Sequence, residues 1–388
     1  MDLFGDLPPP VSETSTRGEP SNLNGSDKCI DLFGDLPPLE SSESRGEKRK
    51  AEEISKDNVK KLATGVKLYK LKGFFAERKG EREEMQDAHV IRDEYYPEPG
   101  RGDDVQRMAY YAVFDGHAGP RASLFAAEHL HENIKSRMPK GSITGKDKEI
   151  KKCLVDAYTL TDEQFLHEAS KGTPVWKDGS TAVSVLVINN TLYVANLGDS
   201  KALVCRCDSA GKISVVRLSK DHSPTGYDER MRIQKAGGYV KDGRVLGVLE
   251  VSRSIGDGRF KRCGVISTPD IMRCTLTDSD RFLLLACDGL WKGFSVDEAV
   301  KYISKILDDD SLATKQESST KQVTNEEPGL DPVEARFQLA CDRIASDAVR
   351  NGSSDNVTVM LVSITGDNQP STFHTSDNKS NTVHIPDS

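Results

Sequence analysis

The segment YYAVFDGH, residues 110–117, sets an apolar run directly against an aspartate, a glycine and a histidine. Its first five residues are apolar or aromatic and predict a β-strand that ends at Asp115. Three more aspartates stand beside strand-like runs in the same way: Asp199, Asp288 and Asp355. Since the end of one antiparallel strand lies beside the start of the next, these carboxylates are expected to converge on one rim of a sheet.

Clustered carboxylates repel one another and raise each other's pKa values. A hard divalent cation removes this repulsion, and oxygen ligands without histidine or cysteine indicate Mg²⁺ or Mn²⁺ rather than Zn²⁺. Taken singly, each aspartate fits a turn or a helix cap equally well. The metal interpretation therefore depends on the group of four and not on any one of them.

Bound divalent ions favour phosphoester chemistry, in which two ions activate a water and clamp the phosphate oxygens. Arg82, in the segment EREEMQD at 81–87, has the planar fork that binds a phosphate through two hydrogen bonds. His117 follows Asp115 by two residues and can protonate a departing oxygen. An exposed arginine and a structural histidine are the alternatives, and the two residues alone leave them open.

Short runs rich in β-branched, aromatic or leucine residues predict six strands: 110–114, 183–188, 192–195, 202–205, 282–286 and 357–364. Asn189-Asn190, between two of these runs, is typical of a hairpin turn. Apolar residues at helical spacing predict four helices: 120–135, around 150–158, 228–236 and around 337–348. Because several strands follow one another without an intervening helix, the pattern favours an antiparallel α+β fold over a doubly wound one.

Composition divides the chain into one domain and three polar segments. The chain has 388 residues and a formal net charge of −8, which argues against a general nucleic-acid binder. Its hydrophobic content of 36 % is low for a globular chain. The deficit is concentrated in a tail at 1–70 and a tail at 367–388, both predicted to be disordered, and in an insertion at 308–332. These segments leave one large domain at 71–366.

No feature of the sequence predicts membrane insertion or secretion. No run of about 18 apolar residues exists, so we expect no transmembrane helix. The N-terminus MDLFGDLPPP lacks the basic and apolar parts of a secretory signal. The eight scattered cysteines fit reduced intracellular thiols. We therefore expect a cytoplasmic chain.

Two features of the N-terminal tail leave alternatives open. DLFGDLPP occurs at 2–9 and again at 31–38, which fits either a docking segment or a duplication in an unconstrained tail. The basic clusters at 48–50 and 60–61 resemble a bipartite nuclear-import signal, and a solvated run of charge is the alternative. The first interpretation of the basic clusters adds the nucleus to the expected location.

Eight segments in this order resemble the metal-dependent, type 2C family of serine/threonine protein phosphatases. They are EREEMQD (81–87), VFDGHAG (113–119), DGSTA (178–182), NLGDS (196–200), ERMRIQKAGG (229–238), VSRSIGD (251–257), ACDGLW (286–291) and GSSDNVT (352–358). Each is ambiguous alone, and the ordered set is specific. The resemblance implies a four-layer α/β/β/α sandwich, with two central antiparallel sheets flanked by helices.

The resemblance also implies a dinuclear Mg²⁺ or Mn²⁺ centre that activates a water for in-line attack on phosphoserine or phosphothreonine. Asp115 would bridge both ions, and the Gly116 carbonyl would bind one of them. Asp288 and Asp355 would bind the other ion. No covalent phosphoenzyme is expected.

The same resemblance implies roles for four further residues. Asp87 would belong to the outer shell of the metal centre, and Asp199 resembles a ligand of a third, weaker ion seen in some members. Arg82 would hold the substrate phosphate. His117 would be the general acid.

The sequence departs from the family pattern at three positions. Gln86 stands where the family often has glutamate, which weakens the outer shell without removing an inner ligand. Lys292 stands where many members have aspartate, which puts the third ion in doubt. Lys201 replaces a common arginine, so the charge survives without the planar fork.

A closer resemblance inside the family is carried by the repeated DLFGDLPP and by GRVLGVLEVSRSIGD at 243–257. It implies integrin-linked kinase as a partner or signalling target, besides phosphoprotein substrates, and we expect a monomer. Two other classes of function remain as alternatives. One is a catalytically weak interaction protein on the same fold, and the other is a metal-independent glycosidase built on paired carboxylates.

Overall fold

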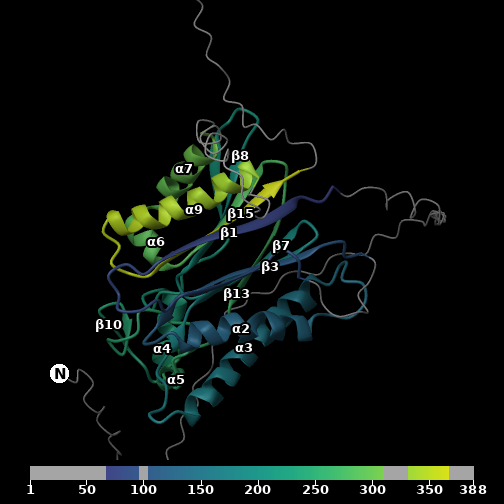
Figure 1. Cartoon of the computed structure of the whole chain (residues 1–388). Helices are drawn as coiled ribbons and strands as arrows, with labels where there is room; N and C mark the ends of the chain where they lie inside the picture. The colour runs from purple at the N-terminus through teal and green to yellow at the C-terminus, as the bar shows by residue number, and fades with distance from the viewer. Residues whose placement is uncertain (1–66, 96–103, 310–330, 367–388) are drawn as a thin grey trace, which may run out of the picture. The chain divides into compact units, whose positions relative to one another are not determined.

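Figure 1 shows a computed structural model of the chain, which describes residues 67–95, 104–309 and 331–366. The chain divides into two units at 1–64 and 65–388, and the described residues all belong to the second. The repeated DLFGDLPP, the basic clusters, residues 310–330 of the insertion and the C-terminal tail from 367 lie outside the described residues. The predictions for these segments stay predictions.

Two five-stranded sheets form the centre of the domain (Figure 1). The first has the order β1 (Lys70–Arg78), β15 (Val357–Thr365), β14 (Asp280–Ala286), β8 (Lys201–Cys207) and β9 (Ile213–Arg217). The second has the order β13 (Asp270–Thr275), β7 (Thr191–Leu197), β6 (Ala182–Ile188), β3 (Met108–Phe114) and β2 (Ala88–Arg92). Every ladder within them is antiparallel, as the sequence pattern predicted.

Helices cover the outer face of each sheet (Figure 1). One group packs on the second sheet: α2 (Arg121–Arg137) and α3 (Asp147–Lys171). The other packs on the first sheet: α6 (Asp288–Gly293), α7 (Val296–Leu307) and α9 (Pro332–Arg350). A third apolar cluster fills the space between the two sheets. The four-layer α/β/β/α sandwich is therefore confirmed.

The position of β3 between two layers explains why residues 110–114 are apolar without alternation. All seven residues of β3 are buried, because one face meets the helices and the other meets the opposite sheet. The β6–β7 hairpin turns at Asn189, whose φ of 51° is the left-handed conformation that asparagine tolerates. β1 begins at Lys70, one residue before the predicted boundary, and Tyr69 is already buried in the cluster between the sheets.

A small three-stranded sheet joins segments that lie far apart in the sequence. Its order is β12 (Ile255–Gly256), β5 (Gly179–Ser180) and β4 (Gly116–His117). Gly179 faces His117, and Gly256 faces Gly179. The sheet therefore places Gly116 and His117 near the VSRSIGD motif, with β5 between them.

The chain between β9 and β13 forms an excursion with its own apolar cluster. It contains α4 (Tyr227–Lys235), β10 (Val240–Lys241), β11 (Arg244–Val245), β12 and α5 (Gly258–Lys261). As predicted, α4 is followed by Gly237, whose φ is 82°. No helix within the described ranges is long and apolar enough to cross a membrane.

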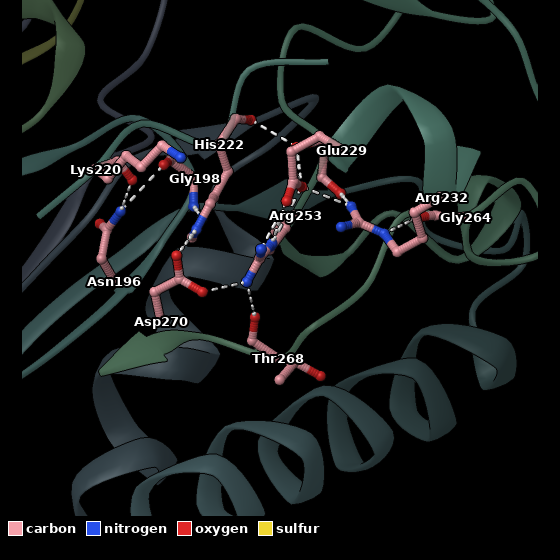
Figure 2. A network of polar contacts seen from close by, with 11 residues as sticks. Asn196, Gly198, Lys220, His222, Glu229, Arg232, Arg253, Gly264, Thr268 and Asp270 are labelled. Atoms are coloured by element: carbon pink, nitrogen blue, oxygen red, sulfur yellow. Dashed lines mark hydrogen bonds and ion pairs between the residues drawn. The ribbon is translucent and has the colours of Figure 1, made fainter. Parts of the chain in front are cut away.

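A network of ion pairs ties this excursion to the second sheet (Figure 2). The Arg253 guanidinium lies 2.6 Å from Glu229 Oε1 in α4 and 2.8 Å from Asp270 Oδ1 at the start of β13. His222 lies 3.1 Å from Asp270 Oδ2 through Nε2, and its Nδ1 accepts a hydrogen bond of 3.1 Å from Gly198 N. The network thus reaches from α4 to the turn that carries Asp199.

Candidate active site

The predicted aspartates converge at one edge of the sandwich. Asp115 follows β3, and Asp288 follows β14 and begins α6. The backbone N–H of Asp288 donates to Asp115 Oδ2 at 3.4 Å. Asp87 immediately precedes β2, and it offers a ligand atom that lies within 4.8 Å of ligand atoms of Asp115 and Cys287. Antiparallel pairing accounts for Asp87 beside Asp115, at β2 and β3, and for Asp288 and Asp355 at the paired strands β14 and β15. The two pairs belong to opposite sheets, so the stacking of the sheets brings them together, where the sequence had predicted one rim of a single sheet.

This cluster is short of positive charge at its centre. Burial raises the pKa of Asp115 well above its usual value, and the negative charge of Asp87 adds to the shift. Burial also raises the pKa of Asp87 to about 7, although a hydrogen bond from Thr358 opposes the shift. For Asp199, burial and then the charge of Asp288 raise the pKa to about 6. Ionised carboxylates are costly here without a cation.

Two basic side chains lie at the outer side of the cluster. Lys292 Nζ lies 2.6 Å from Asp288 Oδ2 and 2.6 Å from Asp355 Oδ2. Arg82 Nη2 lies 2.8 Å from the same Asp355 oxygen, and 57 % of the Arg82 side chain is exposed. Burial of Asp355 tends to raise its pKa. The hydrogen bond and the charge of Lys292 outweigh this tendency, and the pKa of Asp355 is lowered. Arg82 therefore stands at the rim, where an incoming phosphate can reach it.

The donor atoms fit a hard divalent cation. Asp87 Oδ1 is buried and has no hydrogen-bond partner among the described residues, whereas its Oδ2 accepts from Thr358 Oγ1 at 2.7 Å. Cys287 Sγ accepts from Thr358 N at 3.1 Å and donates to Asn356 O at 3.4 Å. Burial raises the pKa of this thiol, so it stays protonated and engaged with the backbone. The available ligands are carboxylate oxygens, which suit Mg²⁺ or Mn²⁺.

Gly116 lies where no side chain fits. A Cβ on Gly116 would stand 2.1 Å from Gln86 O, so the chain ahead of Asp87 packs directly on the backbone beside Asp115. The Gln86 side chain points elsewhere, because its Nε2 donates to Glu84 Oε1 at 2.9 Å. In this structure the amide of Gln86 is therefore hydrogen-bonded within its own loop.

His117 has a carboxylate partner that sequence analysis missed. Its Nε2 lies 2.7 Å from Asp257 Oδ2, which also accepts from Ser254 Oγ at 2.7 Å. Burial opposes protonation, but the charge of Asp257 and this hydrogen bond raise the pKa of His117. A Cβ on Gly179 would lie 2.2 Å from Asp257 Oδ2 and 2.3 Å from His117 Nε2, so only glycine permits this pair.

The missed residues carried weak signals or none. Asp257 ends the motif VSRSIGD, but 140 positions separate it from His117 and no local pattern links the two. Cys287 stands directly before Asp288, and its position beside Asp87 and Asp115 follows only from the stacking of the two sheets. Lys292 was noted as a departure; its spacing of four residues from Asp288 is a local signal for that contact, whereas no local pattern links it to Asp355.

Solved structures share this fold. A serine-threonine phosphatase 2C from Toxoplasma gondii superposes with a TM-score of 0.59 and 22 % identity, covering 77 % of this chain and 98 % of that one. A Caenorhabditis elegans sex determining protein also gives a TM-score of 0.59, with 25 % identity over 76 % of this chain and 64 % of that one. The layers are therefore those of the type 2C phosphatase fold.

Sequence comparison agrees with the fold. The family described as "Protein phosphatase 2C" matches residues 71–357, and the chain belongs to that family. It is 50 % identical to the "Integrin-linked kinase-associated serine/threonine phosphatase 2C" of Bos taurus, over 94 % of this chain and all of the relative. The mouse protein of the same description is 53 % identical over 83 % of this chain and 81 % of its own. The chain is a metal-dependent serine/threonine protein phosphatase, and the glycosidase interpretation is wrong.

Proposed function

We propose that the chain hydrolyses phosphoserine and phosphothreonine in proteins at a centre of two Mg²⁺ or Mn²⁺ ions. Asp115, the Gly116 carbonyl, Asp288 and Asp355 would hold the ions, with Asp87 in the outer shell and Asp199 at a weaker third position. When bound, the ions lower the pKa of a water and neutralise phosphate charge. The convergence of these carboxylates from both sheets at one end of the sandwich, with raised pKa values at the centre of the cluster, carries the proposal.

The protein's own side chains supply binding and protonation. Arg82 reaches the phosphate from the exposed rim, where its guanidinium can form two parallel hydrogen bonds. His117 holds a proton for the departing serine or threonine oxygen, since Asp257 stabilises the imidazolium and orients its ring. Asp257 is thus a positioning residue that acts through His117.

Metal removal tests the proposal directly. After dialysis against a chelator, phosphate release from a phosphothreonine peptide is expected to fall to the background, and Mn²⁺ is expected to restore it. Calorimetric titration of the stripped chain should show two ions per chain, with a weaker third ion at high concentration. Turnover that survives complete chelation would contradict the two-metal centre.

Substitution of Asp257 tests the role of His117. Asp257→Asn is expected to lower kcat on a phosphothreonine peptide by about 10-fold to 100-fold, part of the roughly 10²–10⁴-fold that a general acid supplies. p-Nitrophenyl phosphate has a leaving group that needs no proton, so its hydrolysis should change much less.

The matched controls separate positioning from general damage. Asp257→Glu should recover part of the lost rate. Adding Asp257→Asn to His117→Gln should cost little beyond His117→Gln alone, because Asp257 acts through His117. Equal losses on both substrates would instead indicate that Asp257 only maintains the fold.

We also propose that integrin-linked kinase is a partner or signalling target, reached in the cytoplasm and the nucleus by a monomeric chain. The support is the identity to relatives described as associated with that kinase, which extends over most of the chain. Co-precipitation of the two purified proteins tests the proposed association. If the kinase were not retained, the proposed association would be wrong.

A further inference from the structure

Lys292 connects the two carboxylates proposed to share one metal ion. Its Nζ lies 2.6 Å from an oxygen of Asp288 and 2.6 Å from an oxygen of Asp355. Charge-assisted hydrogen bonds of this length are strong and direct the acceptor lone pairs at the donor. A divalent ion that binds these carboxylates therefore competes with the ammonium for electron density and is repelled by its charge.

The local packing holds the lysine at this place. Lys292 follows Asp288 by four residues in α6, so both side chains lie on one face of the helix. A Cβ on Gly289 would lie 1.9 Å from Asn356 O, and one on Gly293 would lie 2.7 Å from Ala348 O. Because α6 is in such close contact on both sides, Lys292 can leave the carboxylates only by rotating its own side chain.

The Lys292 ammonium can move into solvent when it leaves the carboxylates. The Lys292 side chain is 42 % exposed, whereas those of Asp288 and Asp355 are 24 % and 18 % exposed. The lysine thus approaches from the solvent side, over carboxylates that face inward. Displacement would return its charge to water at the rim beside Arg82, at little desolvation cost.

We propose that Lys292 is a built-in counter-ion of the metal centre, which neutralises Asp288 and Asp355 until a divalent cation displaces it and which thereby weakens cation binding at that position. The inference rests on the proposed metal centre. It explains how this chain tolerates a basic residue beside the ligands. Because the ion must displace the ammonium, loading of the second ion needs a higher free Mg²⁺ or Mn²⁺ concentration.

Metal binding measured without turnover tests this inference. The stripped full-length chain is titrated with Mn²⁺, and free Mn²⁺ is followed by its electron paramagnetic resonance signal and heat by calorimetry. Lys292→Met keeps the length of the stem and removes the charge, so we expect the weaker of the two dissociation constants to fall at least about tenfold, equivalent to about 1.4 kcal/mol. Lys292→Arg keeps the charge and should stay close to the wild type.

Two further variants serve as controls. Lys67→Met removes a lysine that pairs with a carboxylate at 2.8 Å, at the far end of β1 from Asp355, and should leave Mn²⁺ binding unchanged. Lys292→Gln provides a second neutral side chain, and circular dichroism confirms which variants are folded. Mn²⁺ affinity that is unchanged or lower in both neutral variants would overturn the role of Lys292.

Asp288→Asn separates this result from failure of the metal centre itself. It is expected to remove one of the two Mn²⁺ ions, in the wild-type background and in the Lys292→Met background alike. If Asp288→Asn left Mn²⁺ binding intact, the proposed ligand set would be wrong and the inference would fall with it. Loss of an ion in Asp288→Asn together with unchanged affinity in Lys292→Met would overturn the inference alone.

Discussion

Asp115→Asn is expected to lower kcat/KM for a phosphothreonine peptide by about 10³-fold or more. The proposed bridging carboxylate supplies the negative charge that holds both ions, and the amide is nearly isosteric but neutral. Loss of several kcal/mol of metal-dependent transition-state stabilisation corresponds to about a thousandfold in rate. Phosphate release at saturating Mn²⁺ measures the effect. Asp156→Asn, on the exposed side of α3, is the matched control and should be active.

The same substitution should not weaken the fold when metal is absent. Burial raises the pKa of Asp115, so the ionised form is less favourable in the folded state than in the unfolded one. The neutral amide removes that cost, and the thermal midpoint of the stripped variant at neutral pH is expected to equal or exceed that of the wild type. A lower midpoint would contradict this cost of burying the charge, whereas activity within tenfold of the wild type would count against Asp115 as a metal ligand.

Arg253→Met is expected to lower the free energy of unfolding by about 3–5 kcal/mol, the usual cost of removing one partner from a buried ion pair. Arg253 contacts Glu229, Asp270 and the Thr268 carbonyl, and only 14 % of its side chain is exposed (Figure 2). Methionine leaves the buried Glu229 carboxylate without this partner. Urea unfolding measures the change.

A double-mutant cycle isolates the pair. Glu229→Gln combined with Arg253→Met should cost clearly less than the two single substitutions added together, because each single substitution already removes the interaction between the two charges. Additive costs would show that the two charges act independently. A loss below about 1 kcal/mol in Arg253→Met would place the pair among ordinary surface ion pairs.

The pH dependence of stability provides a second check on this network. Burial opposes ionisation of Glu229, but hydrogen bonds from Arg253, Arg232 and Ser252 lower its pKa in the folded state. A depressed folded pKa contributes stability above the unfolded pKa of glutamate, and this contribution is lost as the pH falls into the acid range. The Glu229→Gln variant is expected to lose less stability than the wild type over that range.

Local sequence patterns predicted much of the architecture. The unbroken apolar run at 110–114 predicted the strand β3, and Asn189-Asn190 predicted the hairpin that follows β6. The aspartates at strand ends predicted that the carboxylates converge, which they do. Antiparallel pairing explains the members of each sheet, and the stacking of the two sheets, which the pattern did not predict, joins them. These features follow from the pleat of a strand and from turn geometry, which depend on neighbours in the sequence.

Contacts between distant segments were decided by the tertiary structure. Asp257 meets His117 because β12, β5 and β4 form one small sheet, with glycine at 179 to admit both side chains. Lys292 meets Asp355 because α6 packs closely on the start of β15.

The sequence by itself determined the strands, the turns and the identity of the acidic groups. Only the tertiary structure decided which charges pair, because Coulomb energy depends on distance and burial in space and not on separation along the chain.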